Sequence, residues 1–156
     1  MTQSKPQKKR WKKPLIIVGF LAVVAVAVTY WIVATEKFSD TSSRKAAHTV
    51  NALDLMREFK QNDSLANQKY TDKIITVNGT VSALEAPDSS TVNVIMEDPE
   101  TKDLIIFAFQ EQHLEEGKSL RVGDSVSIKG SCSGGSIDGI LELMKIEFKR
   151  SALNKN

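Results

Sequence analysis

The chain has 156 residues, one cysteine and a formal net charge of +2. With 41% apolar and 26% charged residues, it is neither a disordered tail nor a protein with several membrane spans. Residues 1–34 contain six basic and no acidic residues, whereas residues 35–156 contain 15 basic and 19 acidic ones. The head, residues 1–34, therefore carries a net charge of +6, and the body, residues 35–156, carries −4, which excludes a uniformly basic protein.

Residues 15–34 form an uncharged apolar run of 20 residues. As a helix, a run of this length would be about 30 Å long, which matches the hydrocarbon core of a bilayer. Trp11 and Tyr30 lie near its two ends, where amphipathic rings settle at the headgroups. We predict a transmembrane helix whose membrane residues include Leu15, Ile16, Ile17, Phe20, Leu21, Val24, Val28 and Trp31.

The basic residues before this run predict its orientation. Positive charge stays on the cytoplasmic side, so the body that follows is expected to be exported. A cleaved signal peptide with a site at Ala25-Val26-Ala27 is the alternative, and it would release a secreted soluble domain. No polar segment follows that site, which favours a retained anchor. The residues that set the topology are Lys8, Lys9, Arg10, Lys12 and Lys13.

A polar linker over 35–47 leads to two predicted helices. Ala52, Leu55, Met56 and Phe59 are spaced as one apolar stripe, which predicts a helix over about 46–60 that packs against the domain. Asn62 or Asp63 is then expected to cap a short second helix ending near Tyr70.

From Lys73 the apolar period changes to two, which predicts a long strand over about 73–83. Gly79 is expected to let this strand bend, so that it serves two sheets of a small barrel. Further strands are predicted over 91–97 and 104–109, after Gly123-Asp124, and over 140–148. The connection 110–121 is expected to hold a turn of helix, 133–139 a glycine-rich loop, and 150–156 a flexible tail after a domain over 48–149.

Two stretches carry a resemblance to a known family. Leu55-x3-Phe59-x2-Asn62-x3-Ala66-x3-Tyr70 with Ile75-x-Val77-x-Gly79-x-Val81 resembles the opening of the tRNA-anticodon-like OB-fold family of small bacterial envelope proteins. Val122-Gly123-Asp124-x-Val126-x-Ile128-x-Gly130-x-Cys132 resembles its second half. The resemblance implies a mainly β fold, a five-stranded Greek-key barrel of OB type preceded by an α-helix, and no catalytic residues. With the anchor, it implies a single-pass protein of the inner (cytoplasmic) membrane with a periplasmic domain.

Candidate sites for chemistry are few. His48 and His113 stand in unrelated contexts and are interpreted as solvated surface residues, while Cys132 lies on an apolar strand face and is interpreted as a small buried hydrophobe. The densest cluster of carboxylates is a weak candidate for a metal site, because hard cations are bound by several converging oxygen ligands. The alternative interpretation is the solvated tip of a hairpin. Its residues are Glu97, Asp98, Glu100 and Asp103.

We therefore expect a membrane-anchored, non-catalytic binding or interaction module without a cofactor. Its expected partners are the lipid bilayer and either an envelope protein or a small ligand, bound at loops 84–91, 97–103 or 133–139. The alternative is a single-stranded nucleic-acid-binding OB-fold protein. Nucleic acid is not favoured, because such sites need clustered cations and exposed aromatic rings. The body is acidic, and Phe107 and Phe109 share a predicted core face with Ile105.

Overall fold

The computed structural model describes residues 22–31 and 40–154, and the chain divides into two units, Met1–Ser39 and Asp40–Asn156. In the first unit, residues 22–31 are helical with exposed side chains. Within the described residues no helix has both the length and the apolar character needed to cross a membrane. The rest of the predicted span 15–34, the six basic residues that precede it and linker residues 35–39 lie outside the described residues. The transmembrane anchor and its orientation thus stay predictions.

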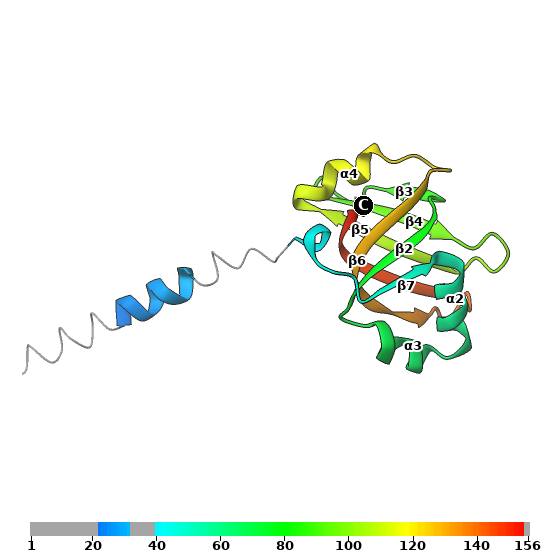
Figure 1. Ribbon diagram of the computed structural model, residues 1–156, viewed down its shortest axis with the longest axis horizontal. Coiled ribbons are helices and arrows are strands. Elements are labelled where there is room, and N and C mark those ends of the chain that lie inside the picture. The colour runs from blue at the N-terminus through cyan, green and yellow to red at the C-terminus, as the bar shows by residue number, and fades with distance from the viewer. Residues whose placement is uncertain (1–21, 32–39, 155–156) are drawn as a thin grey trace, which may run out of the picture. The chain divides into compact units, whose positions relative to one another are not determined.

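The second unit is built on one seven-stranded sheet, in the order β1-β2-β6-β7-β5-β4-β3 (Figure 1). Neighbouring strands are antiparallel except for the pairs β1·β2 and β5·β7, which are parallel. The strands are β1 (His48–Asn51), β2 (Ile74–Thr80), β3 (Ala83–Glu85), β4 (Thr91–Glu97), β5 (Leu104–Gln110), β6 (Ser125–Ile137) and β7 (Met144–Leu153).

The mainly β class is confirmed, but the five-stranded barrel is corrected to an open sheet of seven strands. The long strand predicted over 73–83 is interrupted at Val81 and Ser82, where the backbone changes partners. Val81 exchanges hydrogen bonds with Gly123 and Asp124, whereas the Ser82 N–H donates to Ile95 O. As a result β2 pairs with β6 and β3 pairs with β4, near opposite ends of the sheet order. The predicted change of partner is real, but it comes two residues after Gly79.

Capping side chains mark where the two predicted helices begin. The helix expected over 46–60 starts later than predicted, because residues 48–51 form strand β1, which pairs with β2. The Asn51 side chain then accepts from the Leu53 N–H and caps the helix. Of the two predicted capping residues, Asn62 and Asp63, it is Asn62 whose side chain accepts from the Leu65 N–H and caps the next helix. The helical segments of this unit are η1 (Thr41–Ser43), α2 (Ala52–Gln61), α3 (Asp63–Tyr70), η2 (Glu111–His113) and α4 (Leu114–Ser119).

The predicted apolar faces form the core. The stripe of α2 is 4% exposed or less at every position, and Ile105, Phe107 and Phe109 of β5 are fully buried. Burial of such side chains stabilises the fold by about 1.5–3 kcal/mol each relative to exposure. The stripe consists of Ala52, Leu55, Met56 and Phe59.

The C-terminal part of the fold differs from the sequence prediction. Most of the predicted loop 133–139 is the end of β6, which continues to Ile137 with register shifts beside Ser131 and Gly134. The last strand starts at Met144 instead of 140 and continues to Leu153 instead of 148. Ser151 and Ala152, expected in a flexible tail, are fully buried, because residues 152–153 complete the pairing with the start of β6.

Candidate functional site

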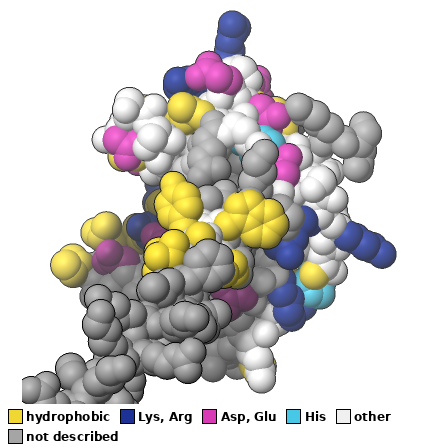
Figure 2. Space-filling model, turned by 90° about the vertical axis from the view of Figure 1, so that its left-hand side faces the viewer, with side chains coloured by type: hydrophobic (Ala, Val, Ile, Leu, Met, Phe, Trp, Pro, Cys, Tyr) yellow, Lys and Arg dark blue, Asp and Glu magenta, His cyan; other side chains and the backbone are white. Residues whose placement is uncertain are grey.

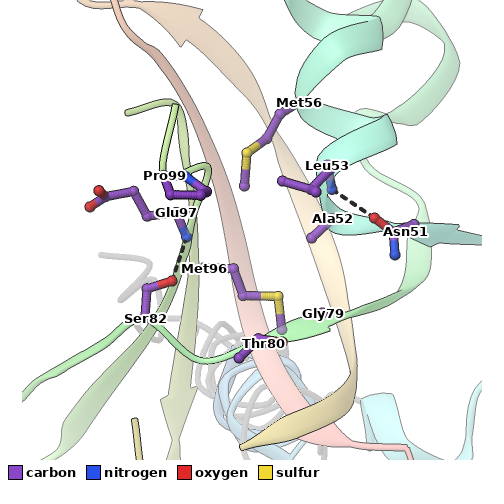
Figure 3. A pocket seen from close by; sticks show the side chains of 10 residues that line it. All are labelled: Asn51, Ala52, Leu53, Met56, Gly79, Thr80, Ser82, Met96, Glu97 and Pro99. Atoms are coloured by element: carbon purple, nitrogen blue, oxygen red, sulfur yellow. Dashed lines mark hydrogen bonds between the residues drawn. The ribbon is translucent and has the colours of Figure 1, made fainter. Parts of the chain in front are cut away.

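The main candidate site is a pocket of about 390 Å³ between the start of α2, the end of β2 and the end of β4 (Figure 3). Protein pockets for small ligands are typically concave and mostly apolar, with a few placed polar groups. Here one lining residue, Glu97, has an ionisable side chain. The lining residues are Asn51, Ala52, Leu53, Met56, Gly79, Thr80, Ser82, Met96, Glu97 and Pro99.

Two methionines give the pocket its apolar floor. Met56 projects from α2 and Met96 from β4 into the space between these elements (Figure 3), and each is 2% exposed or less. Thioether side chains are unbranched and polarisable, so they adapt to ligands of different shape. Gly79 lets the floor close, because a Cβ there would lie 2.6 Å from Met96 Sδ and 2.8 Å from Ala52 Cβ.

Polar groups on the rim are already held by the protein. The Leu53 N–H donates to Asn51 Oδ1 over 2.9 Å, and the Glu97 N–H donates to Ser82 Oγ over 3.0 Å. The Glu97 carboxylate pairs with Lys102 at 2.9 Å on the exposed side. These bonds already satisfy polar groups beside the pocket without a ligand.

The carboxylate cluster predicted as a weak metal site does not converge on one point. Glu97 faces Lys102, while Asp98 Oδ1 accepts from the Glu100 N–H at 2.9 Å. Among the described residues, no three or more His, Cys, Asp or Glu side chains are grouped as metal ligands would be. The reading as a solvated hairpin tip is also corrected in part, because Asp98 and Asp103 are 7% and 2% exposed.

Asp103 is a buried structural carboxylate. It accepts from Lys60 Nζ at 2.9 Å, from the Met144 N–H at 2.8 Å and from the Thr101 hydroxyl at 2.7 Å. Burial by itself raises the pKa of Asp103, but the bonds from Met144, Lys60 and Thr101 outweigh it and leave the pKa below its ordinary value. One side chain thus joins α2, the β4–β5 turn and the start of β7.

The histidine interpretation is wrong for His113, whose side chain is only 12% exposed. Its Nε2 lies 2.6 Å from Asp40 Oδ1 and its Nδ1 lies 3.2 Å from Glu116 Oε2. Hydrogen bonds from the Ser42 hydroxyl and N–H, with a smaller contribution from His113, lower the pKa of Asp40 to about 2. His113 therefore holds the start of this unit against η2 and α4, a contact between residues 73 apart that no local pattern indicates.

The other two candidate residues, His48 and Cys132, pack against other residues of the fold. His48 is partly buried and packs edge-on against the Tyr70 ring at 5.3 Å. Cys132 is fully buried, as predicted, and burial raises the pKa of its thiol to about 11. A thiol with so high a pKa is a poor nucleophile at neutral pH.

The three predicted loops contribute unequally to the pocket. Loop 97–103 supplies Glu97 and Pro99, whereas 84–91 and 133–139 supply no lining residue. Loop 84–91 instead borders a larger hollow of about 540 Å³ with four lining residues, Ser89, Ser90, Gln110 and Leu114. Most pocket residues lie on α2, β2 and β4, where the sequence carries only the signal of a core stripe.

Comparison with known proteins places this fold. The family model described as tRNA_anti-like matches residues 1–145. The chain belongs to the tRNA_anti-like family. A search of curated proteins finds no match for this tRNA_anti-like chain.

Among solved structures, the tRNA_anti-like chain is similar to a protein of Klebsiella pneumoniae subsp. pneumoniae MGH 78578 described as a "putative nucleic acid-binding lipoprotein". The TM-score is 0.54 at 18% identity, over 69% of this chain and 91% of that one. At this identity the likeness concerns the fold.

Proposed function

We propose that this tRNA_anti-like protein is an exported, membrane-anchored OB-type binding module without catalytic activity. The observation that carries the proposal is the preformed pocket of about 390 Å³ with its methionine floor. Its lining fits a small, largely uncharged ligand or an apolar side chain of an envelope protein. The uncharged run 15–34 and its basic flank support the anchor and the export.

Methyl NMR of the full chain tests the pocket. With 13C-labelled methionine methyl groups, titration with the uncharged probe N-phenyl-1-naphthylamine is expected to shift the resonances of Met56 and Met96. Met144 is buried outside the pocket lining and serves as an internal reference that stays in place. Thr80→Trp places a bulky ring in the lining and should abolish the shifts, whereas Thr49→Trp at an exposed position of β1 should keep them. Equal shifts at all three methionines, or none, would contradict the proposal.

Single-stranded nucleic acid is the second candidate, favoured by the description of the Klebsiella structure. Stacking of bases needs exposed aromatic rings. In residues 40–154 every aromatic ring of Phe or Tyr is at most 1% exposed, namely Phe59, Tyr70, Phe107, Phe109 and Phe148. A single-stranded oligonucleotide added to the same labelled chain at low salt distinguishes the candidates. Micromolar binding that weakens steeply with salt would favour nucleic acid.

A further inference from the structure

Basic side chains gather on one face of the second unit although the unit as a whole is acidic. Residues 40–154 contain 13 basic and 18 acidic residues. Figure 2 shows Lys and Arg side chains collected along one side of the view, next to a histidine. We define the basic face as Arg44, Lys45, Lys73, Lys129 and Lys149.

Backbone pairing brings these residues together. Ser131 of β6 pairs with Ile74 on one side and with Lys149 on the other, so Ile74, the chain neighbour of Lys73, lies about 10 Å from Lys149 across the sheet. Lys129 lies two residues before Ser131 on the same outward side, and its Nζ donates to Ser42 O at 3.1 Å. That bond holds η1 against the sheet, and Arg44 and Lys45 follow η1 directly.

Within residues 40–154, the cations of the basic face form no close ion pair with a carboxylate. Among residues 40–154, none of the five takes part in a side-chain ion pair closer than 4.0 Å, whereas Lys60, Lys69, Lys102 and Lys118 each do. Lys73 Nζ instead donates to the Lys69 carbonyl. Asp72 adjoins Lys73 in sequence and is the acidic residue nearest the face along the chain. Four of the five cations are exposed, the exception being half-buried Lys129.

Part of the basic face lies beside the point at which the chain enters the unit, since Lys129 bonds to Ser42 and Ala47 bonds to Ile74, the neighbour of Lys73. Asp40 precedes η1, and the predicted anchor ends at residue 34. In the sequence, only the five residues 35–39 separate the end of the predicted anchor from Asp40. The carboxylate-rich turn 97–103 lies away from the basic face, because the Met144 N–H at the start of β7 donates to Asp103. Along β6, the start of β7 is about 26 Å from Lys129.

We propose that the basic face lies against anionic phospholipid headgroups and orients the domain on the membrane that anchors it, which rests on the anchor of the proposed function. Lys and Arg side chains are attracted to an anionic surface within about one Debye length, roughly 8 Å at physiological salt. Nucleic acid is the other polyanion that such a face could meet. The buried aromatic rings and the position of the face at the chain entry favour lipid.

Lysine footprinting on the full chain tests this orientation. The protein is reconstituted into vesicles of phosphatidylcholine, alone or mixed with phosphatidylglycerol, and treated with a membrane-impermeant acetylating reagent. We expect acetylation of Lys73 and Lys149 to slow at least about threefold with phosphatidylglycerol and to recover in high salt. Lys102 and Lys118, which lie outside the basic face, should react equally in both vesicles. Equal rates at all four lysines would overturn the proposal.

Two double variants and an experiment with a second polyanion, a single-stranded oligonucleotide, test the same proposal further. Arg44→Glu with Lys149→Glu should remove the protection of Lys73, whereas Lys102→Glu with Lys118→Glu should leave it intact. Stronger protection by a single-stranded oligonucleotide than by phosphatidylglycerol would assign the face to nucleic acid and overturn the proposal. If the anchor itself fails, the chain will not sediment with phosphatidylcholine vesicles. Sedimentation with phosphatidylglycerol vesicles then reports on the basic face alone, and its absence overturns the proposal.

Discussion

At the scale of single residues, side chains that look alike in sequence have different roles. Glu97 and Asp103 belong to one acidic turn, yet the Glu97 side chain is 36% exposed and the Asp103 side chain 3%. An exposed ion pair contributes little because water and salt screen it. A buried carboxylate with three donors is different, since removing it leaves those donors without a partner.

Asp103→Asn is therefore expected to lower the free energy of unfolding by about 2 kcal/mol at neutral pH. Because the folded pKa of Asp103 lies below its ordinary 3.8, its contribution is present above that value and is lost as pH falls through the folded pKa. The difference between wild type and Asp103→Asn should thus shrink in acid. Urea unfolding across pH measures it, with Glu97→Gln as the control, expected to cost less than about 1 kcal/mol. An equal cost for both variants would contradict the assignment.

At the scale of elements, the close approach of α2 to the sheet depends on one small residue. Ala52 of α2 and Met96 of β4 lie against Gly79 of β2, and all three line the pocket together with Met56. The strand pattern predicts a glycine that bends the chain, whereas the structure gives that glycine a packing role. Interiors are packed too densely to accept an added methyl group without movement.

Gly79→Ala should destabilise the protein by about 1–3 kcal/mol, because the new Cβ overlaps the Ala52 Cβ and the Met96 sulfur. Gly139→Ala is the matched control, since a Cβ there meets nothing within 4 Å. Thermal unfolding of both variants gives the comparison. If the two substitutions prove equally mild, the pocket floor is softer than the packing indicates.

At the scale of the whole molecule, charge is divided along the chain. The first 34 residues carry six cations and no anion, while residues 40–154 carry five more acidic than basic residues. Within that acidic unit, part of the basic face lies beside the point at which the chain enters. The predicted membrane topology and the proposed orientation use these two groups of cations on opposite sides of the bilayer.

A reporter fused after Asn156 tests the topology. Alkaline phosphatase, which needs an oxidising compartment, should be active there, while a reporter that works only in the cytoplasm should be inactive. Changing Lys8, Lys9, Arg10, Lys12 and Lys13 to Gln should lower the fraction of active phosphatase, because the orienting charge is lost. The opposite pattern in the unchanged protein would exclude an exported domain.

By itself the sequence determined the faces that are buried, because burial follows the local periods of helix and strand. The stripe of α2, the inward face of β5 and the cap at Asn62 are confirmed at the predicted residues. The sequence did not determine that residues 48–51 form β1, that β7 continues to Leu153 or that the sheet is open. Backbone pairing decides these features, and it joins residues far apart in the chain. The tertiary structure alone decided the pocket, the burial of Asp103, the His113–Asp40 contact and the basic face. Each of these depends on distances between separate segments, which neither composition nor periodicity encodes.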